Sequence, residues 1–303
     1  MRSLIEGGQA RVVVATASDA VREMALRHQT FGVPAVALGR AALAGLLLAT
    51  LTKDEEQVTL QVLGNGPLGG VTVDARSSGR VRAFVKRPGA VTWDPALTSA
   101  PRLVLGDAIG KQGVVNVIRD LGMAQNYSGQ VALSTGEIDE EVEQYLTQSE
   151  QIDSILRCET LVDSAGKVTA AAGLLVQTLP QAHGAAVVEF LRDTLRGPAF
   201  TSLLKAAVAQ GQVDPESLAR AALGQCADSM QVLDLREVSF FCPCTQERAL
   251  ATLGMLSPDD LKEMILETNE AEVTCNFCGK QYHFSEIELE RIRRKHAKPM
   301  PQA

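Results

Sequence analysis

The sequence predicts an α+β protein with three parts, and three observations support that prediction. Over residues 1–180, short runs rich in Val, Ile and Thr alternate with turns that contain Gly, Asn or Ser, which is typical of a mainly antiparallel sheet packed with helices. Residues 181–235 become helical in character and are interrupted by Gly and Pro. Residues 236–303 hold four of the six cysteines and predict a small separate domain.

The N-terminal part is predicted to combine helices with antiparallel strands. A β-branched strand at 10–17 precedes a helix at 19–28, for which Ser18 is the expected N-cap. An acidic helix is expected at 138–150, and its carboxylates are interpreted as a solvated face whose charge favours the helix N-terminus. Further strands are expected at 56–63, 71–76, 81–86, 113–118, 127–133, 155–162 and 167–177.

The apolar segment 33–51 raises the question of a membrane span. Gly39, Arg40 and Gly45 interrupt it and no anchoring pattern flanks it, so a buried helix that begins at Pro34 is the better interpretation. No apolar signal-peptide region follows the N-terminal residues. The sequence therefore predicts a cytoplasmic protein with no membrane partner. In that compartment, paired cysteines more often bind metals or sense oxidants than form permanent disulfides.

Two features that could suggest nucleotide or nucleic-acid binding have simpler explanations. Gly64, Gly66 and Gly69 match G-x-G-x-x-G, but that pattern binds a pyrophosphate only where a helix follows, and here a strand is expected. The basic residues at 291–298 complement the dipole of a terminal helix. The net charge of −7 also argues against a nucleic-acid partner.

The connector, 181–235, is predicted to be a series of short amphipathic helices. Asp214 as N-cap, with Pro215 and Glu216 in the first turn, marks a clear helix start. Helices this short hold their shape mostly by packing on neighbours. We therefore expect the order of the connector to depend on what it contacts.

The C-terminal part is predicted to be a module of short, capped elements. Thr245 is the expected cap of a helix that ends at Gly254, and a second helix starts at Ser257. A capping box is expected at residues 285–288. Tyr282 and Phe284 alternate with polar residues, which predicts a half-buried strand.

Two cysteine pairs predict a metal site in this module. Cys242 and Cys244 form a C-x-C pair, and Cys275 and Cys278 form a C-x-x-C pair. Together they supply the tetrahedral thiolate set that zinc prefers, and a closed site of this kind has no open position for hydrolytic catalysis. His283 is the only histidine near them, and we expect it to be exposed because four thiolates already complete the site.

The same four cysteines could also sense oxidants. A module of about sixty residues buries little apolar surface, and structural zinc can contribute about 10–16 kcal/mol to such a fold. Partners two or three residues apart are near enough in sequence for a disulfide, and zinc keeps cysteine as the oxidisable thiolate. Oxidation would remove the ligands, release the metal and unfold the module, which predicts a redox switch.

Cys158 and Cys226 stand apart from these pairs. No histidine is placed to activate either thiol, so we expect small buried residues and not nucleophiles.

Several blocks of the sequence match one known family. Residues 241–248 (FCPCTQER) and 273–278 (VTCNFC) contain the cysteine pairs, and further blocks lie at 64–69, 136–151 and 171–180. Together these blocks resemble the heat shock protein 33 family of redox-regulated chaperones over nearly the whole chain. The sequence departs from the family at Thr245, where serine is usual, and at Ala172, where a second glycine is common.

The resemblance implies an ATP-independent holdase that is inactive when reduced and zinc-bound, and not an enzyme. One zinc per chain would be bound by Cys242, Cys244, Cys275 and Cys278. Oxidation would join Cys242 to Cys244 and Cys275 to Cys278, expel zinc and loosen the connector. The active form would be a homodimer that protects unfolding client proteins from aggregation under oxidative stress. The resemblance assigns no role to Cys158 or Cys226.

Two other classes of function remain open. The chain could be a zinc-containing thiol–disulfide oxidoreductase that uses Cys275 and Cys278, although no thioredoxin-like strand–C-x-x-C–helix context is present. It could also be a zinc-ribbon adaptor for RNA or a protein, although the acidic composition disfavours RNA. The client-binding surface does not follow from the sequence.

Overall fold

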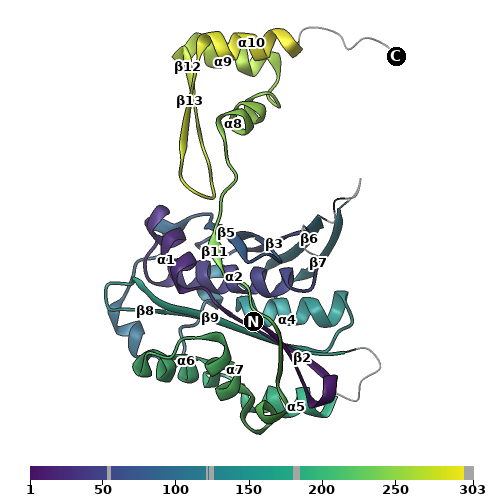
Figure 1. The fold of residues 1–303 in the computed structure, drawn as a ribbon. Coiled ribbons are helices and arrows are strands. Elements are labelled where there is room, and N and C mark those ends of the chain that lie inside the picture. Colours follow the sequence, from purple (N-terminus) through teal and green to yellow (C-terminus); the bar gives the residue numbers. More distant parts are fainter. Residues whose placement is uncertain (53–55, 121, 123–125, 180–184, 297–303) are drawn as a thin grey trace. The chain divides into compact units, whose positions relative to one another are not determined.

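The structure is a computed structural model that describes residues 1–52, 56–120, 122, 126–179 and 185–296. It contains two compact units, Met1–Phe241 and Cys242–Ala303, and the described part of the connector belongs to the first (Figure 1). The predicted α+β class is confirmed. The three-part division at 1–180, 181–235 and 236–303 stays a proposal.

The described residues of the first unit form two sheets. Sheet A has the order β10-β1-β2-β9-β8 and is antiparallel throughout. Its strands are β1 (Arg2–Ile5), β2 (Ala10–Thr16), β8 (Ser154–Val162), β9 (Val168–Thr178) and β10 (Gln231–Asp234). The connector therefore supplies an edge strand of this sheet, because β10 pairs with β1.

Sheet B has the order β11-β5-β4-β3-β6-β7, and only its β11–β5 pair is parallel among the described strands. Its strands are β3 (Gln57–Gly64), β4 (Val71–Arg76), β5 (Arg80–Val85), β6 (Gly113–Asp120), β7 (Tyr127–Ala132) and β11 (Ser239–Phe240). The strands expected from the sequence are thus confirmed, with ends that shift by one or two residues.

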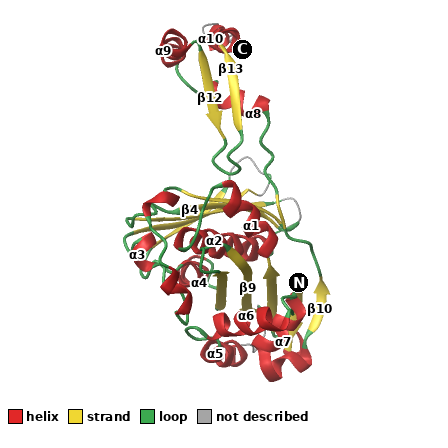
Figure 2. Ribbon diagram, turned by 90° about the vertical axis from the view of Figure 1, so that its left-hand side faces the viewer, coloured by secondary structure: helices red, strands yellow, loops and turns green. Residues whose placement is uncertain are grey.

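The helix α2 (Val33–Ala49) packs against both sheets, as Figure 2 shows between β4 and β9. Two glycines permit the close approach: a Cβ on Gly39 would lie 2.3 Å from the Thr160 hydroxyl, and one on Gly45 would lie 2.7 Å from Val73. Every residue of α2 is buried, which is typical of a helix that is apolar all round. The buried-helix prediction is confirmed. No helix in the described residues has the length and apolar character needed to span a membrane.

The connector helices cover the outer face of sheet A (Figure 1). They are α5 (Ala185–Thr194), α6 (Ala199–Gln210) and α7 (Pro215–Leu223), followed by a short 3₁₀ turn. Asp214 caps α7 as predicted, since its carboxylate accepts the amides of Glu216 and Ser217. An apolar cluster joins this face of sheet A to the connector helices. Its members on the sheet side are Ile5, Val12, Val14, Leu174 and Val176, and those on the helices are Val188, Leu191, Phe200, Leu204 and Leu218.

A buried charge network links α2 to the connector. Arg40 is fully buried, and its guanidinium donates to Glu159 at 2.9 and 3.1 Å and to Glu137 at 3.1 Å. The hydroxyl of Thr201 on α6 donates to the second carboxylate oxygen of Glu159 at 2.5 Å. Glu137 also accepts the amide of Gly106 at the start of α3 (Gly106–Ile109). Burial raises the pKa of Glu137, and Arg40 opposes that shift only in part.

The prediction of a solvated acidic face is wrong for one side of α4 (Ile138–Ser149). Asp139 is buried and accepts two hydrogen bonds from Arg102, each at 2.7 Å. Burial raises the pKa of Asp139, but the guanidinium groups of Arg102 and Arg40 outweigh it and hold that pKa below its usual value. Glu141 is also buried and accepts the amides of residues 134–136. These carboxylates face inward because the helix period places Asp139 beside Val142, three residues on, and Glu141 beside Tyr145, four residues on, and both apolar residues are buried.

One predicted helix cap and one predicted turn have different outcomes. Ser18 does not cap α1 (Ser18–Arg27); its hydroxyl instead accepts the amide of Ala171 on β9 at 3.1 Å, so a tertiary contact replaced the local one. The glycine pattern at 64–69 forms a turn as expected, since the Gly66 amide donates to Ile109 at 2.8 Å and β4 follows.

As far as the structure describes it, to residue 296, the second unit is a β-hairpin packed with three helices. It comprises α8 (Gln246–Leu253), α9 (Pro258–Thr268), β12 (Glu270–Thr274), β13 (Gln281–Ser285) and α10 (Glu286–His296). Thr245 caps α8, Ser257 forms a capping box with Asp260, and the Ser285 amide donates to Glu288. Tyr282 and Phe284 point inward as predicted. Only nine apolar side chains of its described residues are buried together, so this core is small.

Candidate metal centre

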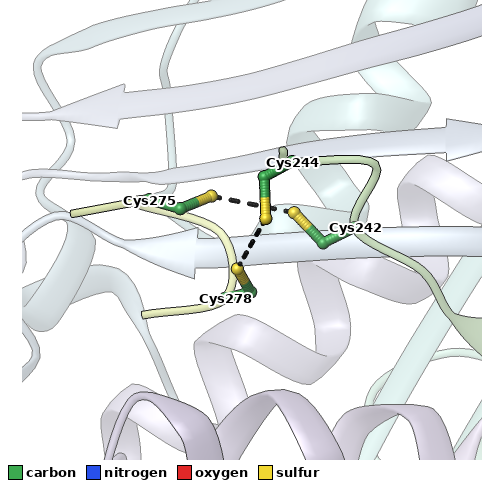
Figure 3. A group of neighbouring side chains, drawn as sticks. All are labelled: Cys242, Cys244, Cys275 and Cys278. Atoms are coloured by element: carbon green, nitrogen blue, oxygen red, sulfur yellow. Dashed lines mark hydrogen bonds between the residues drawn. The ribbon is translucent and has the colours of Figure 1, made fainter. Parts of the chain in front are cut away.

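All four cysteines of the two pairs lie in the second unit and converge on one point (Figure 3). Cys242 and Cys244 lie in the segment that precedes α8, and Cys275 and Cys278 lie at the tip of the β12–β13 hairpin. The chain therefore brings together two loops that are about thirty residues apart in sequence, as a structural metal site does.

The hairpin tip is shaped by its backbone. The Cys275 amide donates to Lys280 at 2.9 Å, and the Gly279 amide donates to the Cys275 carbonyl at 2.8 Å. Gly279 has a φ of +70°, a left-handed conformation that glycine adopts without steric cost. This turn places the sulfurs of Cys275 and Cys278 on the same side of the hairpin.

The other loop is held by the first turn of α8. The Thr245 hydroxyl accepts the Arg248 amide at 3.3 Å, and the Arg248 guanidinium donates to the Pro243 carbonyl at 3.0 Å. Both bonds tie the residues around Cys244 to the helix that follows them. The position of Cys244 thus depends on a capped helix and not on a loop alone.

The distances fit a tetrahedral metal ion. The sulfurs of Cys242 and Cys275 are 3.7 Å apart, those of Cys244 and Cys278 are 3.2 Å apart, and all four lie within 4.8 Å of one another. A tetrahedral zinc with bonds of about 2.3 Å separates its sulfurs by about 3.8 Å. The four cysteines could therefore hold a metal ion with little movement.

The electrostatics of the cluster favour a cation. Burial raises the pKa of Cys244, but the neighbouring Tyr282 and the other three cysteines outweigh burial and lower that pKa to about 7. Burial and the neighbouring thiols raise the pKa of Cys278. The pKa of Tyr282 is also raised, because its hydroxyl lies beside Cys244. One thiolate forms readily here, but four negative charges need a metal ion beside them.

The remaining candidate residues lie elsewhere. His283 is exposed on β13, and its ring lies 3.9 Å from Glu272 and not among the sulfurs, as expected. Cys158 is buried on β8 in the first unit and Cys226 is half-buried after α7. Burial raises the pKa of both thiols, which disfavours a nucleophilic role.

Sequence reasoning missed one residue of the centre. Tyr282 was expected only as an inward residue of a strand, whereas its hydroxyl lies beside Cys244. Tyrosine is not among the usual zinc ligands, so the only signal was its inward position on β13, opposite Val273. Cys275 and Cys278 lie on a hairpin and not at a helix N-terminus, which does not favour a thioredoxin-like oxidoreductase.

Known proteins resemble this chain over nearly its full length. A family model described as "Hsp33 protein" matches residues 1–285. A 33 kDa chaperonin of Desulforamulus reducens is 35% identical over 298 residues, which cover 97% of this chain and 97% of that protein. One from Listeria welshimeri serovar 6b is 32% identical over 292 residues, which cover 96% and 97%.

A solved structure agrees with these sequence matches. The crystal structure of the 33 kDa chaperonin (heat shock protein 33 homolog) of Thermotoga maritima superposes with a TM-score of 0.82 and is 29% identical. The match covers 98% of this chain and 97% of that one. Chaperonin is the name of a non-enzymatic function, in agreement with the expectation from the sequence.

Proposed function

The chain belongs to the Hsp33 family of chaperones, and from that premise we propose that it is a redox-regulated, ATP-independent holdase. The observation that supports this proposal best is the cluster of four sulfurs within 4.8 Å in a unit with a small core. Such a unit depends on its metal for stability, so the loss of four thiolates is a large perturbation.

In the reduced state one zinc ion per chain is bound by Cys242, Cys244, Cys275 and Cys278. Zinc would keep all four sulfurs as thiolates and add its binding free energy to that of the fold. The capped start of α8 and the left-handed turn at Gly279 hold the four sulfurs in place for it.

Oxidation converts the ligands into two disulfides. Each pair of thiolates gives two electrons to one hydrogen peroxide, which takes up two protons from the solvent and becomes two molecules of water, and the metal departs as Zn²⁺. The products are Cys242–Cys244 and Cys275–Cys278. Two sulfur distances between the pairs are short, at 3.7 Å from Cys242 to Cys275 and 3.2 Å from Cys244 to Cys278, so mapping of the disulfides must separate local from crossed products.

Loss of the second unit's order then loosens the connector, whose helices pack mainly on sheet A. The oxidised protein forms a homodimer and binds unfolding client proteins in the cytoplasm during oxidative stress. It needs no nucleic acid and no membrane. The net charge of −7 supports the absence of a nucleic-acid partner, because phosphate groups bind to basic surfaces.

The test combines three measurements on one sample. Zinc content, thiol count and suppression of client aggregation are measured before and after peroxide treatment with mild heat. We expect one zinc per chain to be lost as four thiols disappear, together with a gain of chaperone activity. A Cys244→Ser variant should not retain the metal, whereas Cys226→Ser should behave like the parent. Equal protection of clients by the reduced and oxidised protein would refute the switch.

A further inference from the structure

Tyr282 carries a buried hydroxyl that has no hydrogen-bond partner. The side chain is 4% exposed and belongs to the small core of the second unit, against which Cys244 and Cys275 also pack. Its hydroxyl oxygen is buried as well, and no group among the described residues forms a hydrogen bond with it. A buried polar group without a partner is destabilising, so the position of this hydroxyl needs a physical reason.

The fold places this hydroxyl beside the sulfur of Cys244. Tyr282 lies on the inward side of β13, opposite Val273 on β12 and close to the hairpin tip that carries Cys275 and Cys278. The pKa of the hydroxyl is raised, chiefly by its interaction with Cys244 and then by burial, so the two groups are neighbours. The Lys280 ammonium lies 5.0 Å from the ring centroid and helps to hold the ring in this position.

A metal ion bound by the four cysteines would turn Cys244 into a strong acceptor. Four thiolates carry more negative charge than one Zn²⁺ neutralises, so negative charge remains on the sulfurs. A charged acceptor forms a shorter and stronger hydrogen bond than a neutral thiol does. A tyrosine hydroxyl keeps its proton at neutral pH, so Tyr282 can donate to that thiolate without becoming a ligand itself.

We propose that Tyr282 is a positioning residue of the metal centre: its hydroxyl donates to the zinc-bound thiolate of Cys244, strengthens metal binding and slows the oxidation of that sulfur. The proposal rests on the zinc site and the redox switch of the proposed function. It adds to them a residue that controls how readily the metal is released.

The effect on oxidation follows from the first step of that reaction. The thiolate of Cys244 attacks hydrogen peroxide, so that an S–O bond forms, the O–O bond breaks and hydroxide leaves. The thiolate of Cys242 then displaces a second hydroxide to form the disulfide, and two protons from the solvent convert both hydroxides into water. A hydrogen bond to Cys244 lowers the energy of the lone pair that attacks, so the hydroxyl of Tyr282 slows the first step.

The test compares the full chain with its Tyr282→Phe variant, both reduced and loaded with zinc. Phenylalanine keeps the buried ring and removes only the hydroxyl. Tyr145→Phe is the matched control, because it removes another buried tyrosine hydroxyl from the other compact unit. In a chelator competition, we expect Tyr282→Phe to bind zinc about tenfold more weakly than the parent and the control. Zinc release driven by peroxide should be about threefold faster, since the nucleophilicity of a thiolate changes less steeply than its basicity.

Substitution of Co²⁺ for zinc separates a hydrogen bond from an effect on packing. The sulfur-to-cobalt charge-transfer band reports the energy of the sulfur lone pairs, and the d–d bands report the tetrahedral geometry. Loss of the donor in Tyr282→Phe should move the charge-transfer band to lower energy and leave the d–d bands in place. Should this variant fail to fold, 3-fluorotyrosine at position 282 keeps the ring and the hydroxyl, donates more strongly and should move the band to higher energy.

Three outcomes would overturn the proposal: equal zinc affinity of the parent and Tyr282→Phe, a charge-transfer band that does not move, or an equal loss of zinc affinity in Tyr145→Phe. A parent that binds neither zinc nor cobalt would overturn the metal centre itself and this proposal with it. A parent that binds both metals but does not protect clients after oxidation would refute only the holdase function. The affinities and spectra would still decide the role of Tyr282, because neither measurement depends on clients.

Discussion

Replacement of Thr201 by valine should loosen the attachment of α6 to the first unit. The Thr201 hydroxyl donates to a carboxylate oxygen of Glu159 at 2.5 Å, and the two residues are 3% and 2% exposed. Valine has nearly the same shape but no donor, so the substitution leaves that buried oxygen without its partner on α6. Glu159 keeps its bonds to Arg40 and to the amide of Thr160 through the other oxygen.

The free-energy cost of Thr201→Val follows from these contacts. Loss of a hydrogen bond to a buried charged group should destabilise the attachment by about 1.5–3 kcal/mol. Thr201→Ser is the matched control, because it keeps the hydroxyl and removes one methyl group, at a cost of about 0.8 kcal/mol. The valine variant should therefore be the less stable of the two, although serine removes more apolar surface.

Two measurements test this ranking of the stabilities of the valine and serine variants. Urea unfolding can be followed at Trp93, the single tryptophan, whose indole donates to Ser164 within the first unit. Amides of α6 should exchange about ten- to a hundredfold faster in the valine variant. If the switch operates as proposed, this variant should also protect clients after milder oxidation. Equal stability of the valine and serine variants would refute a contribution from the hydroxyl.

Three further substitutions test the charge network and the metal centre. Arg40→Met leaves the buried carboxylates of Glu137 and Glu159 without this cation. It should lower the free energy of unfolding, measured in urea, by about 3–5 kcal/mol. Asp139→Asn should destabilise the protein at neutral pH, because the lowered folded pKa of Asp139 adds stability above its usual pKa of 3.8. That stability is lost as the pH falls from 3.8 through the folded pKa, so acid unfolding curves of variant and parent should converge. Gly279→Ala imposes a left-handed backbone on alanine and should weaken zinc binding about fivefold in a chelator competition, the equivalent of about 1 kcal/mol.

Each substitution has a control on the same chain. Arg196 is exposed, so Arg196→Met should leave stability nearly unchanged. Glu140→Gln removes an exposed carboxylate beside Asp139, and its acid unfolding should follow that of the parent. Gly254 has a φ of −64°, which alanine adopts readily, and Gly254→Ala should retain zinc. If Gly254→Ala lost as much zinc affinity as Gly279→Ala, that result would contradict the argument from the left-handed backbone at Gly279.

Local patterns predicted most elements because they act over a few residues. The strands of both sheets follow from runs of β-branched residues bounded by turns. Asp214 and Thr245 cap helices as predicted, since a cap needs only a side chain two or three residues before the amides it accepts. The four sulfurs lie together as predicted: each pair is already close in sequence, and the fold brings the two pairs together.

Predictions failed where a distant partner competed with a local one. Ser18 accepts an amide of β9 and not one of its own helix, and no local signal distinguishes the two. The acidic run at α4 carried no sign that Arg102 lies opposite Asp139. The two-residue strand β11 is too short for a periodic signal, and its partner β5 lies far before it in the chain.

The sequence by itself determined the α+β class, the helix caps at Asp214 and Thr245 and the two cysteine pairs of the second unit, because each depends on chemistry carried by neighbouring residues. Only the tertiary structure decided which charges are buried with Arg40, which face of sheet A the connector covers and which segment lies on the edge of β5. These outcomes depend on contacts between residues far apart in the chain. Burial removes water as the competing partner, so the nearest group in space, and not in sequence, forms the bond.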